Sequence, residues 1–394
     1  MLQRTRHFAA PHKAWDRGDA EAAIGEIAAD ALATLDPGAL WPAHPMDDGL
    51  PDGTGSLYFG AAGVVWALDH LARAGATAPT PDLLPVLATA LERNAPWFAS
   101  TRYPGHASLL MGDLGIQLVA MRLAPDQGLA DKIYILAATN TGLATVELRW
   151  GLPGSMLACL HMRAMTGDAR FGALFQVQAT RLLAEFEADE GGPIWTQDLY
   201  DSRQRWLGPV HGFAGNMLPL LHGWRLLTPG QRAVVADAVP RTLASHAIRS
   251  ELGATWPAVV PTSRTTFLCQ HCHGAPGMVT AFADAPFSMP DFEALLLQGG
   301  ELTWNAGPLV KGSNLCHGTG GNGYALLKLY KRTGDPAWLD RARAFAMTAI
   351  EQVRGAWAAF GRGRYSLWTG DAGLAVYLWD CIKGEPRFPA IDVL

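Results

Sequence analysis

The sequence predicts an all-α fold, an α/α toroid in which seven helix pairs form an inner and an outer ring. Two observations support this prediction. The pattern Gly-x-x-Gly followed by an apolar run occurs seven times, at intervals of roughly 40 to 60 residues, which is typical of an array of similar supersecondary units. The segments between the copies have helical periodicity, and no stretch shows the alternation of successive strands. Fourteen helices in a single domain would account for residues 1–394.

The glycine turns are expected to start the helices of the inner ring. Their first glycines are Gly60, Gly112, Gly151, Gly212, Gly274, Gly318 and Gly370. The segments that follow are strongly apolar, as expected of helices buried on most sides, at residues 64–72, 116–123, 155–165, 216–227, 278–283, 322–330 and 374–382. More amphipathic segments are expected to form the outer ring, for example at residues 19–35, 82–98, 169–187, 230–248 and 337–353.

Two connections between these segments repeat in detail, at residues 165–168 and 332–335. Each contains Thr-Gly-Asp, in which the glycine suits the left-handed position just past a helix end and the aspartate caps the next helix. An open solenoid is the competing arrangement. It needs polar capping helices at its ends, and the lack of such segments in the sequence favours a closed ring.

In a closed ring the glycine turns would gather at one rim, where small residues let loops approach one another and a ligand. Three loops rich in proline and tryptophan, at residues 40–55, 191–209 and 254–266, are expected to form the walls of a cleft there.

Composition excludes several classes of partner. The chain is 49% apolar and 17% charged, and its net charge of −5 is spread without a basic run, so neither nucleic acid nor an anionic membrane is expected to bind. The first residues lack the apolar core of a signal peptide, and no uninterrupted apolar window is long enough to span a bilayer. We therefore expect a cytoplasmic protein, in which the five cysteines are thiols or metal ligands rather than disulfides.

Three consecutive glycine turns carry a sulfur or imidazole donor before the glycine, in Val210-His211-Gly212, Cys272-His273-Gly274 and Cys316-His317-Gly318. A catalytic zinc has three protein ligands and one open position, and it accepts thiolates and imidazoles. The set Cys272, Cys316 and His317 therefore predicts a zinc site.

The alternative is that both cysteines are small buried hydrophobes and the histidine is a hydrogen-bonded turn residue. The occurrence of Cys-His-Gly in two equivalent turns favours the metal. Cys269 lies outside the repeat and is an alternative ligand or a redox thiol.

These motifs carry a resemblance to a known family. Cys-His-Gly-Ala-Pro-Gly at 272–277, Cys-His-Gly-x-x-Gly-Asn at 316–322, His-Gly-x-Ala-Gly at 211–215 and the seven glycine turns resemble lanthionine synthetase C-like proteins over essentially the whole chain. Arg387-Phe388-Pro389-Ala390 is similar to the tail of the stand-alone, eukaryotic-type members. The resemblance implies a seven-fold α/α toroid and one zinc ion on Cys272, Cys316 and His317.

The resemblance also implies the addition of a thiol to dehydroalanine or dehydrobutyrine, giving a thioether by way of an enolate. His211 matches the family's acid position and is expected to protonate the enolate, the alternative being a histidine that caps its own turn. Glu147 stands where the peptide cyclases carry Asp and the stand-alone members carry Glu. This position therefore agrees with the stand-alone members and departs from the peptide cyclases.

In the stand-alone group, cations contact the carboxylates of glutathione, and the resemblance implies the same role for Lys311, Arg4 and Arg364. Arg362 is the alternative to Arg364.

Three functions follow as hypotheses. The first is zinc-dependent addition of glutathione or a peptide cysteine to a dehydroamino acid supplied by a separate dehydratase, because the toroid uses the whole sequence. The second is a zinc-bearing thiol- or peptide-binding protein with a regulatory role. The third, an α/α-barrel carbohydrate enzyme, would need two carboxylates facing a cleft, whereas the repeated turns carry sulfur and imidazole.

Overall fold

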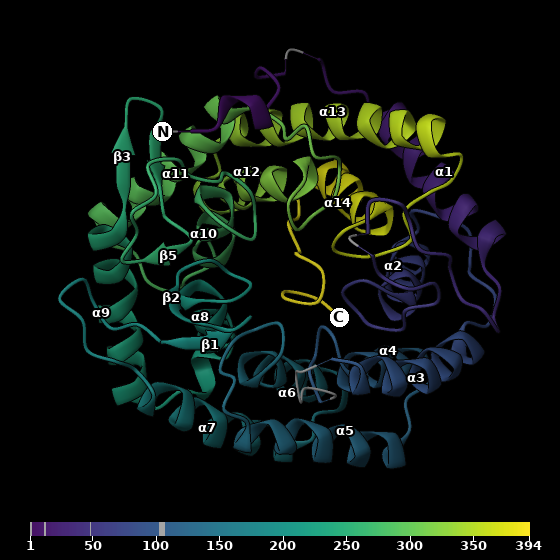
Figure 1. Ribbon diagram of the computed structural model, residues 1–394, viewed down its shortest axis with the longest axis horizontal. Helices are drawn as coiled ribbons and strands as arrows, with labels where there is room; N and C mark the ends of the chain where they lie inside the picture. Colours follow the sequence, from purple (N-terminus) through teal and green to yellow (C-terminus); the bar gives the residue numbers. More distant parts are fainter. Residues whose placement is uncertain (1, 12, 48, 102–106) are drawn as a thin grey trace.

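The computed structural model describes residues 2–11, 13–47, 49–101 and 107–394. In this part of the chain, fourteen α-helices form two concentric rings, which Figure 1 shows in face view. The predicted α/α toroid is therefore confirmed. None of the helices in the described part combines the length and the apolar composition needed to cross a membrane.

Seven strongly buried helices form the inner ring: α2 (Ala61–Arg73), α4 (Asp113–Leu123), α6 (Leu152–Thr166), α8 (Phe213–His222), α10 (Ala275–Phe282), α12 (Thr319–Thr333) and α14 (Asp371–Lys383). Helices buried on one face form the outer ring: α1 (Arg17–Thr34), α3 (Leu84–Ala99), α5 (Gln127–Thr139), α7 (Ala169–Ala184), α9 (Pro229–His246), α11 (Pro290–Ala306) and α13 (Pro336–Phe360). The two repeated linkers behave as predicted, since Gly167 and Gly334 are left-handed and Asp168 and Asp335 cap α7 and α13.

Some boundaries differ from the prediction. The expected helix at 216–227 ends at His222, and a 3₁₀ turn, η3 (Trp224–Leu226), follows it after Gly223. Further 3₁₀ turns are η1 (Arg4–Arg6) and η2 (Asn140–Gly142). Helix α13 continues seven residues beyond the expected end, to Phe360, and Gly361 is its C-cap.

Two of the loops that were expected to be irregular contain short strands. Strands β1 (Gln197–Leu199), β2 (Ser202–Trp206) and β5 (Val259–Val260) form an antiparallel sheet in the order β1-β2-β5. Strands β3 (Ile248–Ser250) and β4 (Gly253–Thr255) form a separate hairpin.

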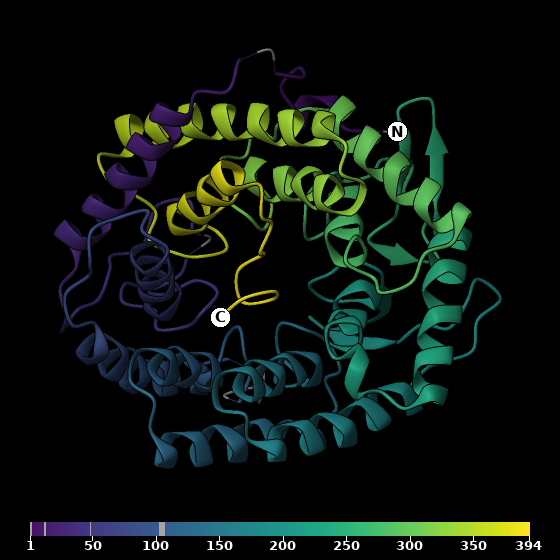
Figure 2. The same cartoon turned by 180° about the vertical axis from the view of Figure 1, so that it is seen from behind.

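The ring is closed, which excludes the open solenoid. Helix α14 packs against both α1 and α2, and the views from the two faces agree on this (Figures 1 and 2). The seam is also joined by a backbone hydrogen bond of 3.1 Å from the Trp368 amide to the Tyr58 carbonyl. These residues belong to the last and the first glycine turns, so the turns themselves form part of the closure.

The second glycine of each turn is required by close packing. A Cβ on Gly321 would lie 1.7 Å from the carbonyl oxygen of Leu315 and 3.0 Å from the Cβ of His271 in the neighbouring turn. A Cβ on Gly63 would meet Leu57 and, across the seam, Leu367 in the same way. Neighbouring turns therefore pack against each other through a position where a side chain would collide with backbone.

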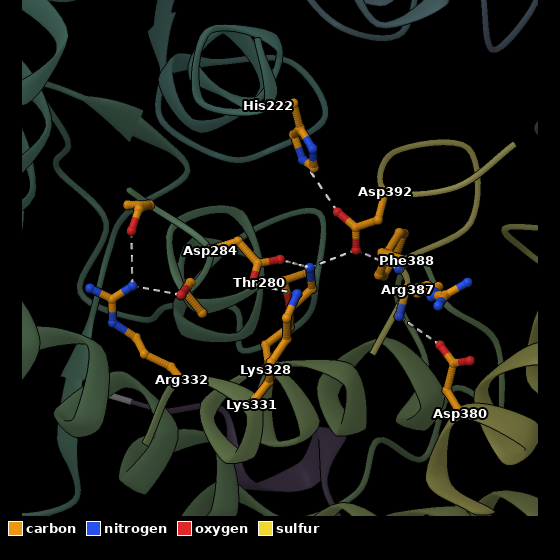
Figure 3. A network of polar contacts seen from close by, with 12 residues as sticks. His222, Thr280, Asp284, Lys328, Lys331, Arg332, Asp380, Arg387, Phe388 and Asp392 are labelled. Atoms are coloured by element: carbon orange, nitrogen blue, oxygen red, sulfur yellow. Dashed lines mark hydrogen bonds and ion pairs between the residues drawn. The ribbon is translucent and has the colours of Figure 1, made fainter. Parts of the chain in front are cut away.

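The C-terminal tail enters the middle of the ring (Figures 1 and 2). Lys328 of α12, which is 1% exposed, forms ion pairs with Asp284 and with Asp392 of the tail, the latter at 2.6 Å (Figure 3). Burial acts to lower the pKa of Lys328, but Asp392 and Asp284 raise it above its ordinary value. Phe388 of the tail stacks on His271, with the ring centroids 4.3 Å apart, and so supports the turn that carries Cys272.

The substitution Lys328→Met is expected to lower the free energy of unfolding by about 3 to 5 kcal/mol, because it removes the buried cation that Asp284 and Asp392 share. Urea unfolding followed by circular dichroism measures the effect. Lys331→Met is the matched control: its ammonium group also pairs with Asp284, at 3.1 Å, but its side chain is 53% exposed. We expect a change of at most about 0.5 kcal/mol there. Equal effects in the two variants would contradict a structural role for the buried pair.

Candidate active site

One cleft lies over the rim formed by the glycine turns, and its volume is about 420 Å³. Most of its lining residues occupy the two positions directly before the first glycine of a turn. These are Tyr58, Phe59, Met111, Arg149, Trp150, Val210, His211, Cys272, His273, Cys316, His317 and Thr369. The repeat thus delivers side chains from all seven turns to one place.

Backbone hydrogen bonds hold neighbouring turns in a row at this rim. The Cys272 amide donates to the Cys316 carbonyl at 3.0 Å, and the Cys316 amide donates to the Trp368 carbonyl at 2.8 Å. The Trp368 amide continues the row to Tyr58, whose own amide donates to Leu110 at 2.9 Å. Cys272 and Cys316 are therefore close because their turns are adjacent in the ring, although many residues separate them along the chain.

The structure brings the three predicted metal ligands together. The ligand atoms of Cys272, Cys316 and His317 lie within 4.8 Å of one another, and no other group of three such ligands occurs in the described residues. Both cysteines are buried, and the buried Nε2 of His317 has no hydrogen-bond partner among the residues that the structure describes. An unpaired buried imidazole nitrogen beside two thiols fits the donor set of a zinc ion.

Each sulfur of this group also accepts a hydrogen bond. The Tyr58 hydroxyl donates to Cys316 Sγ at 2.7 Å, and Gln270 Nε2 donates to Cys272 Sγ at 2.9 Å. The hydrogen bond from the Cys272 thiol lowers the pKa of Cys316 well below its ordinary value against the effect of burial, with help from His317. The same bond, together with burial, raises the pKa of Cys272. One thiolate is therefore stabilised before any cation binds.

Cys269 is not part of this group. Its side chain is buried, and burial raises the pKa of its thiol to about 12, against a smaller effect of Thr303. A thiol of this kind is protonated at neutral pH, which does not favour a redox role.

His211, which lines the same cleft as the three predicted metal ligands, is paired with Glu147. His211 Nδ1 lies 2.7 Å from Oε2 of Glu147, which is fully buried and accepts a second hydrogen bond from the Trp150 amide. Because the carboxylate only accepts, it takes the hydrogen of Nδ1 and holds the ring in one orientation. Nε2 lies 3.3 Å from the Tyr200 hydroxyl. The pair has the geometry of an oriented proton donor.

A second histidine, His273, also lines the cleft. Burial lowers its pKa to about 4, with a smaller effect of His211, so this imidazole is neutral at neutral pH. His273 is therefore a poor source of a proton at that pH.

The sequence analysis missed Tyr200, which reaches His211 from the hairpin of β1 and β2. Leu199 pairs with Ser202, and the two residues between them, Tyr200 and Asp201, have φ of 55° and 57°. Such turns are usually signalled by Asn-Gly or Asp-Gly, and this one has neither, so the sequence contained no local signal for it.

It also missed Tyr58 and Arg149. Each stands two positions before the first glycine of its turn, which is the position of Cys272 and Cys316 in theirs. Equivalence of the turns is therefore the sequence signal that places both residues at the rim.

The three predicted substrate-binding cations do not lie in the same pocket. Arg364 lines the cleft, where its Nε donates to Asp47 at 2.6 Å, and Arg362 is not among the lining residues. Lys311 is exposed outside the lining, but its charge acts on Cys272. Arg4 donates to the Asn305 carbonyl at 3.0 Å and lines a separate pocket. The structure thus brings one of the three cations into the cleft.

Of the loops expected to wall the cleft, residues 40–55 contribute Asp47 and Leu50, although residue 48 lies outside the described part. Residues 259–264 line another pocket.

Comparison with known proteins identifies the family of the chain. The family model for lanthionine synthetase C-like protein matches residues 195–393, which is half of the chain. The matched part contains the three candidate ligands and His211, whereas Glu147 precedes it.

Two curated relatives are similar over a part of the chain. The chain is 31% identical over 194 residues to "Glutathione S-transferase LANCL1" of Danio rerio, which covers 48% of this chain and 47% of that protein. It is 32% identical over 197 residues to "LanC-like protein GCL1" of Arabidopsis thaliana, which covers 48% of this chain and 44% of that protein. The match thus spans about half the length of these relatives.

Among solved structures, "Nisin cyclase" is similar in fold, with a TM-score of 0.57 at 13% identity, covering 84% of this chain and 94% of that one. From the family match, together with the closed ring, we conclude that the chain belongs to the lanthionine synthetase C-like family.

Proposed function

We propose that the protein catalyses the zinc-dependent addition of a thiol to dehydroalanine or dehydrobutyrine, which forms a thioether. The observation that carries this proposal is that the Cys272, Cys316 and His317 group and the His211–Glu147 pair line or border one cleft. Cys272, Cys316 and His317 would hold the zinc ion, which would stabilise the substrate thiol as its nucleophilic thiolate, with the thiol proton passing to solvent.

The residues of the chain supply the remaining chemistry. The sulfur forms a bond to the β-carbon of the dehydro residue, the π pair of the carbon–carbon double bond becomes a double bond between the α-carbon and the carbonyl carbon, and the carbonyl π pair moves onto the oxygen to give the enolate. His211 then gives the proton on Nε2 to the α-carbon, and the carbonyl re-forms. Glu147 holds the Nδ1 hydrogen and thereby keeps Nε2 directed to the cleft. Solvent returns a proton to His211 after each turnover.

We propose glutathione or a peptide cysteine as the thiol. One relative is named a glutathione S-transferase and the structural neighbour is named a cyclase, and both names suit thiol chemistry. Arg364 in the cleft and the exposed Lys311 are the cations we propose for the carboxylates of glutathione, and Arg4 is proposed as a more distant contact. The dehydro residue would come from a separate dehydratase, and we expect the reaction in the cytoplasm.

The cleft supports the carbohydrate hypothesis less well. Asp47 is the carboxylate among its described lining residues, and it is paired with Arg364 at 2.6 Å. A pair of carboxylates on either side of a cleft, which glycoside hydrolysis requires, is therefore not present in the lining that the structure describes.

The test is incubation of the zinc-loaded protein with glutathione and a peptide that contains dehydroalanine. We expect the peptide to gain the mass of one glutathione, and we expect the metal-free protein not to produce this adduct above the uncatalysed rate. A second peptide that carries both dehydroalanine and cysteine tests ring formation, which alkylation of the remaining thiol detects. Tight binding of either substrate without a product would instead support the regulatory binding protein.

A further inference from the structure

Arg149 is a cation held among aromatic rings at the edge of the cleft. Its guanidinium carbon lies 4.9 Å from the ring centroids of Tyr58 and Phe59 and 5.2 Å from that of Trp150. Three rings leave the guanidinium little freedom to move, so its position is determined before any substrate arrives.

This guanidinium is only partly satisfied by the protein. Nη1 donates to the Tyr200 hydroxyl over a long 3.4 Å, and the buried Nε has no hydrogen-bond partner in the described part of the chain. No carboxylate of the described residues forms an ion pair with it, and the nearby Glu147 is occupied by His211 and the Trp150 amide. An arginine that lines a cleft with unused donors is suited to bind an anionic oxygen.

The charge is retained in this setting. Burial alone would lower the pKa of Arg149, but the surrounding groups, first Tyr58 and then Tyr200, raise it above its ordinary value. The side chain is therefore a permanent cation at the pH of the reaction.

The side chains that contact Arg149 show that it lies between the predicted metal ligands and the proposed proton donor. On one side lies Tyr58, whose ring faces the guanidinium and whose hydroxyl donates to Cys316 Sγ at 2.7 Å. On the other side, the Tyr200 hydroxyl contacts both Arg149 and His211 Nε2. In the proposed reaction the β-carbon approaches the sulfur held at the predicted metal ligands, and the α-carbon approaches His211. The carbonyl attached to the α-carbon must then lie between these two groups, which is where Arg149 is.

We propose that Arg149 is a catalytic residue that binds the carbonyl oxygen of the dehydro residue and stabilises the negative charge that develops there. This inference rests on the proposed function and deepens it. As the sulfur–carbon bond forms, the double bond shifts to lie between the α-carbon and the carbonyl carbon and the carbonyl π pair moves onto the oxygen, and the guanidinium donates hydrogen bonds to that oxygen while it is part of the enolate. The charge returns to the α-carbon when His211 protonates it, and Arg149 neither gains nor loses a proton. A preorganised cation aimed at a developing oxyanion is among the largest sources of rate enhancement.

The test compares zinc-loaded Arg149→Met and Arg149→Lys with the wild type. Methionine keeps an unbranched chain between the rings without the charge, and lysine keeps the charge without the planar donors. The acceptor is a dehydroalanine peptide, and the thiols are glutathione, which carries carboxylates, and cysteamine, which carries none. Arg225→Met, in the exposed η3 turn, is the control for the loss of an arginine.

We expect Arg149→Met to lower kcat by about 100-fold with both thiols and with little change in KM for the thiol. Arg149→Lys should recover part of that loss, Arg225→Met should match the wild type, and zinc content should be stoichiometric throughout. A rise in KM for glutathione alone, with kcat and the cysteamine reaction unchanged, would show a carboxylate anchor for the thiol and would overturn the proposal. Unchanged kinetics in Arg149→Met would overturn it as well.

The wild-type protein separates this inference from the proposed function. If the wild type forms no adduct with either thiol, the proposed function fails and the inference fails with it. If the wild type is active and Arg149→Met is equally active, the inference alone is wrong.

Discussion

Replacing Cys316 with alanine is expected to leave the purified protein without stoichiometric zinc. Cys316 supplies one of three donor atoms that lie within 4.8 Å of one another. The hydrogen bond from the Cys272 thiol lowers the pKa of Cys316, which favours its thiolate form. Loss of residues that only orient metal ligands typically costs 10- to 100-fold in affinity, so loss of a ligand should cost more than about 100-fold. Elemental analysis after dialysis against a metal-free buffer measures the occupancy.

Cys269→Ala is the matched control, since it removes another buried thiol three residues before Cys272. It should retain a full equivalent of zinc, because Cys269 is not part of the ligand group. The backbone bonds that Cys316 makes to Cys272 and Trp368 do not depend on its side chain, so the variant should keep its helical circular dichroism. Full zinc occupancy in Cys316→Ala would refute the ligand assignment.

His211→Ala is expected to lower the rate of thioether formation by about 100- to 10,000-fold while zinc remains bound. The imidazole is the group we propose to protonate the α-carbon, and it lies outside the ligand group. Mass spectrometry of the glutathione adduct over time gives the rate, and elemental analysis of the same preparation gives the zinc content.

Two further variants sharpen this result. Glu147→Gln should also reduce the rate, because the amide can present its NH₂ group to Nδ1 and disturb the orientation of the ring. The reduction should be smaller than in His211→Ala, because the amide oxygen can still accept the Nδ1 hydrogen. His246→Ala is the control, since His246 lies at the end of α9 and does not line the cleft. A His211→Ala protein with wild-type turnover would show that another group delivers the proton, and one without zinc would show that His211 supports the metal site instead.

The repeated turn explains why the architecture could be predicted. Its second glycine is required wherever a turn packs against its neighbour, as at Gly63 and Gly321, so each copy marks one repeat. The donors at Cys272, Cys316 and His317 could be predicted for the same reason, because equivalent positions of a closed repeat must lie side by side.

Other parts of the site could not be predicted from local patterns. The sheet pairs Trp206 with Val259, and the proline- and tryptophan-rich loops that supply them show no strand alternation. Arg4 and Arg364 were both assigned by resemblance, yet they line different pockets. Tyr200 reaches His211 through a left-handed turn with no glycine or asparagine to signal it.

Periodicity and the spacing of the glycine turns are local properties of the chain, and they suffice to predict the helix pairs, their number and the group formed by Cys272, Cys316 and His317. Closure of the ring is a long-range property. It sets Tyr58 of the first turn against Cys316 of the sixth turn, and it places Arg149 of the third turn over the Tyr58 ring, because contacts across a ring depend on how many repeats close it and how tightly the turns pack. The sequence therefore determines which side chains line the rim, whereas their positions relative to one another are set when the last turn packs against the first.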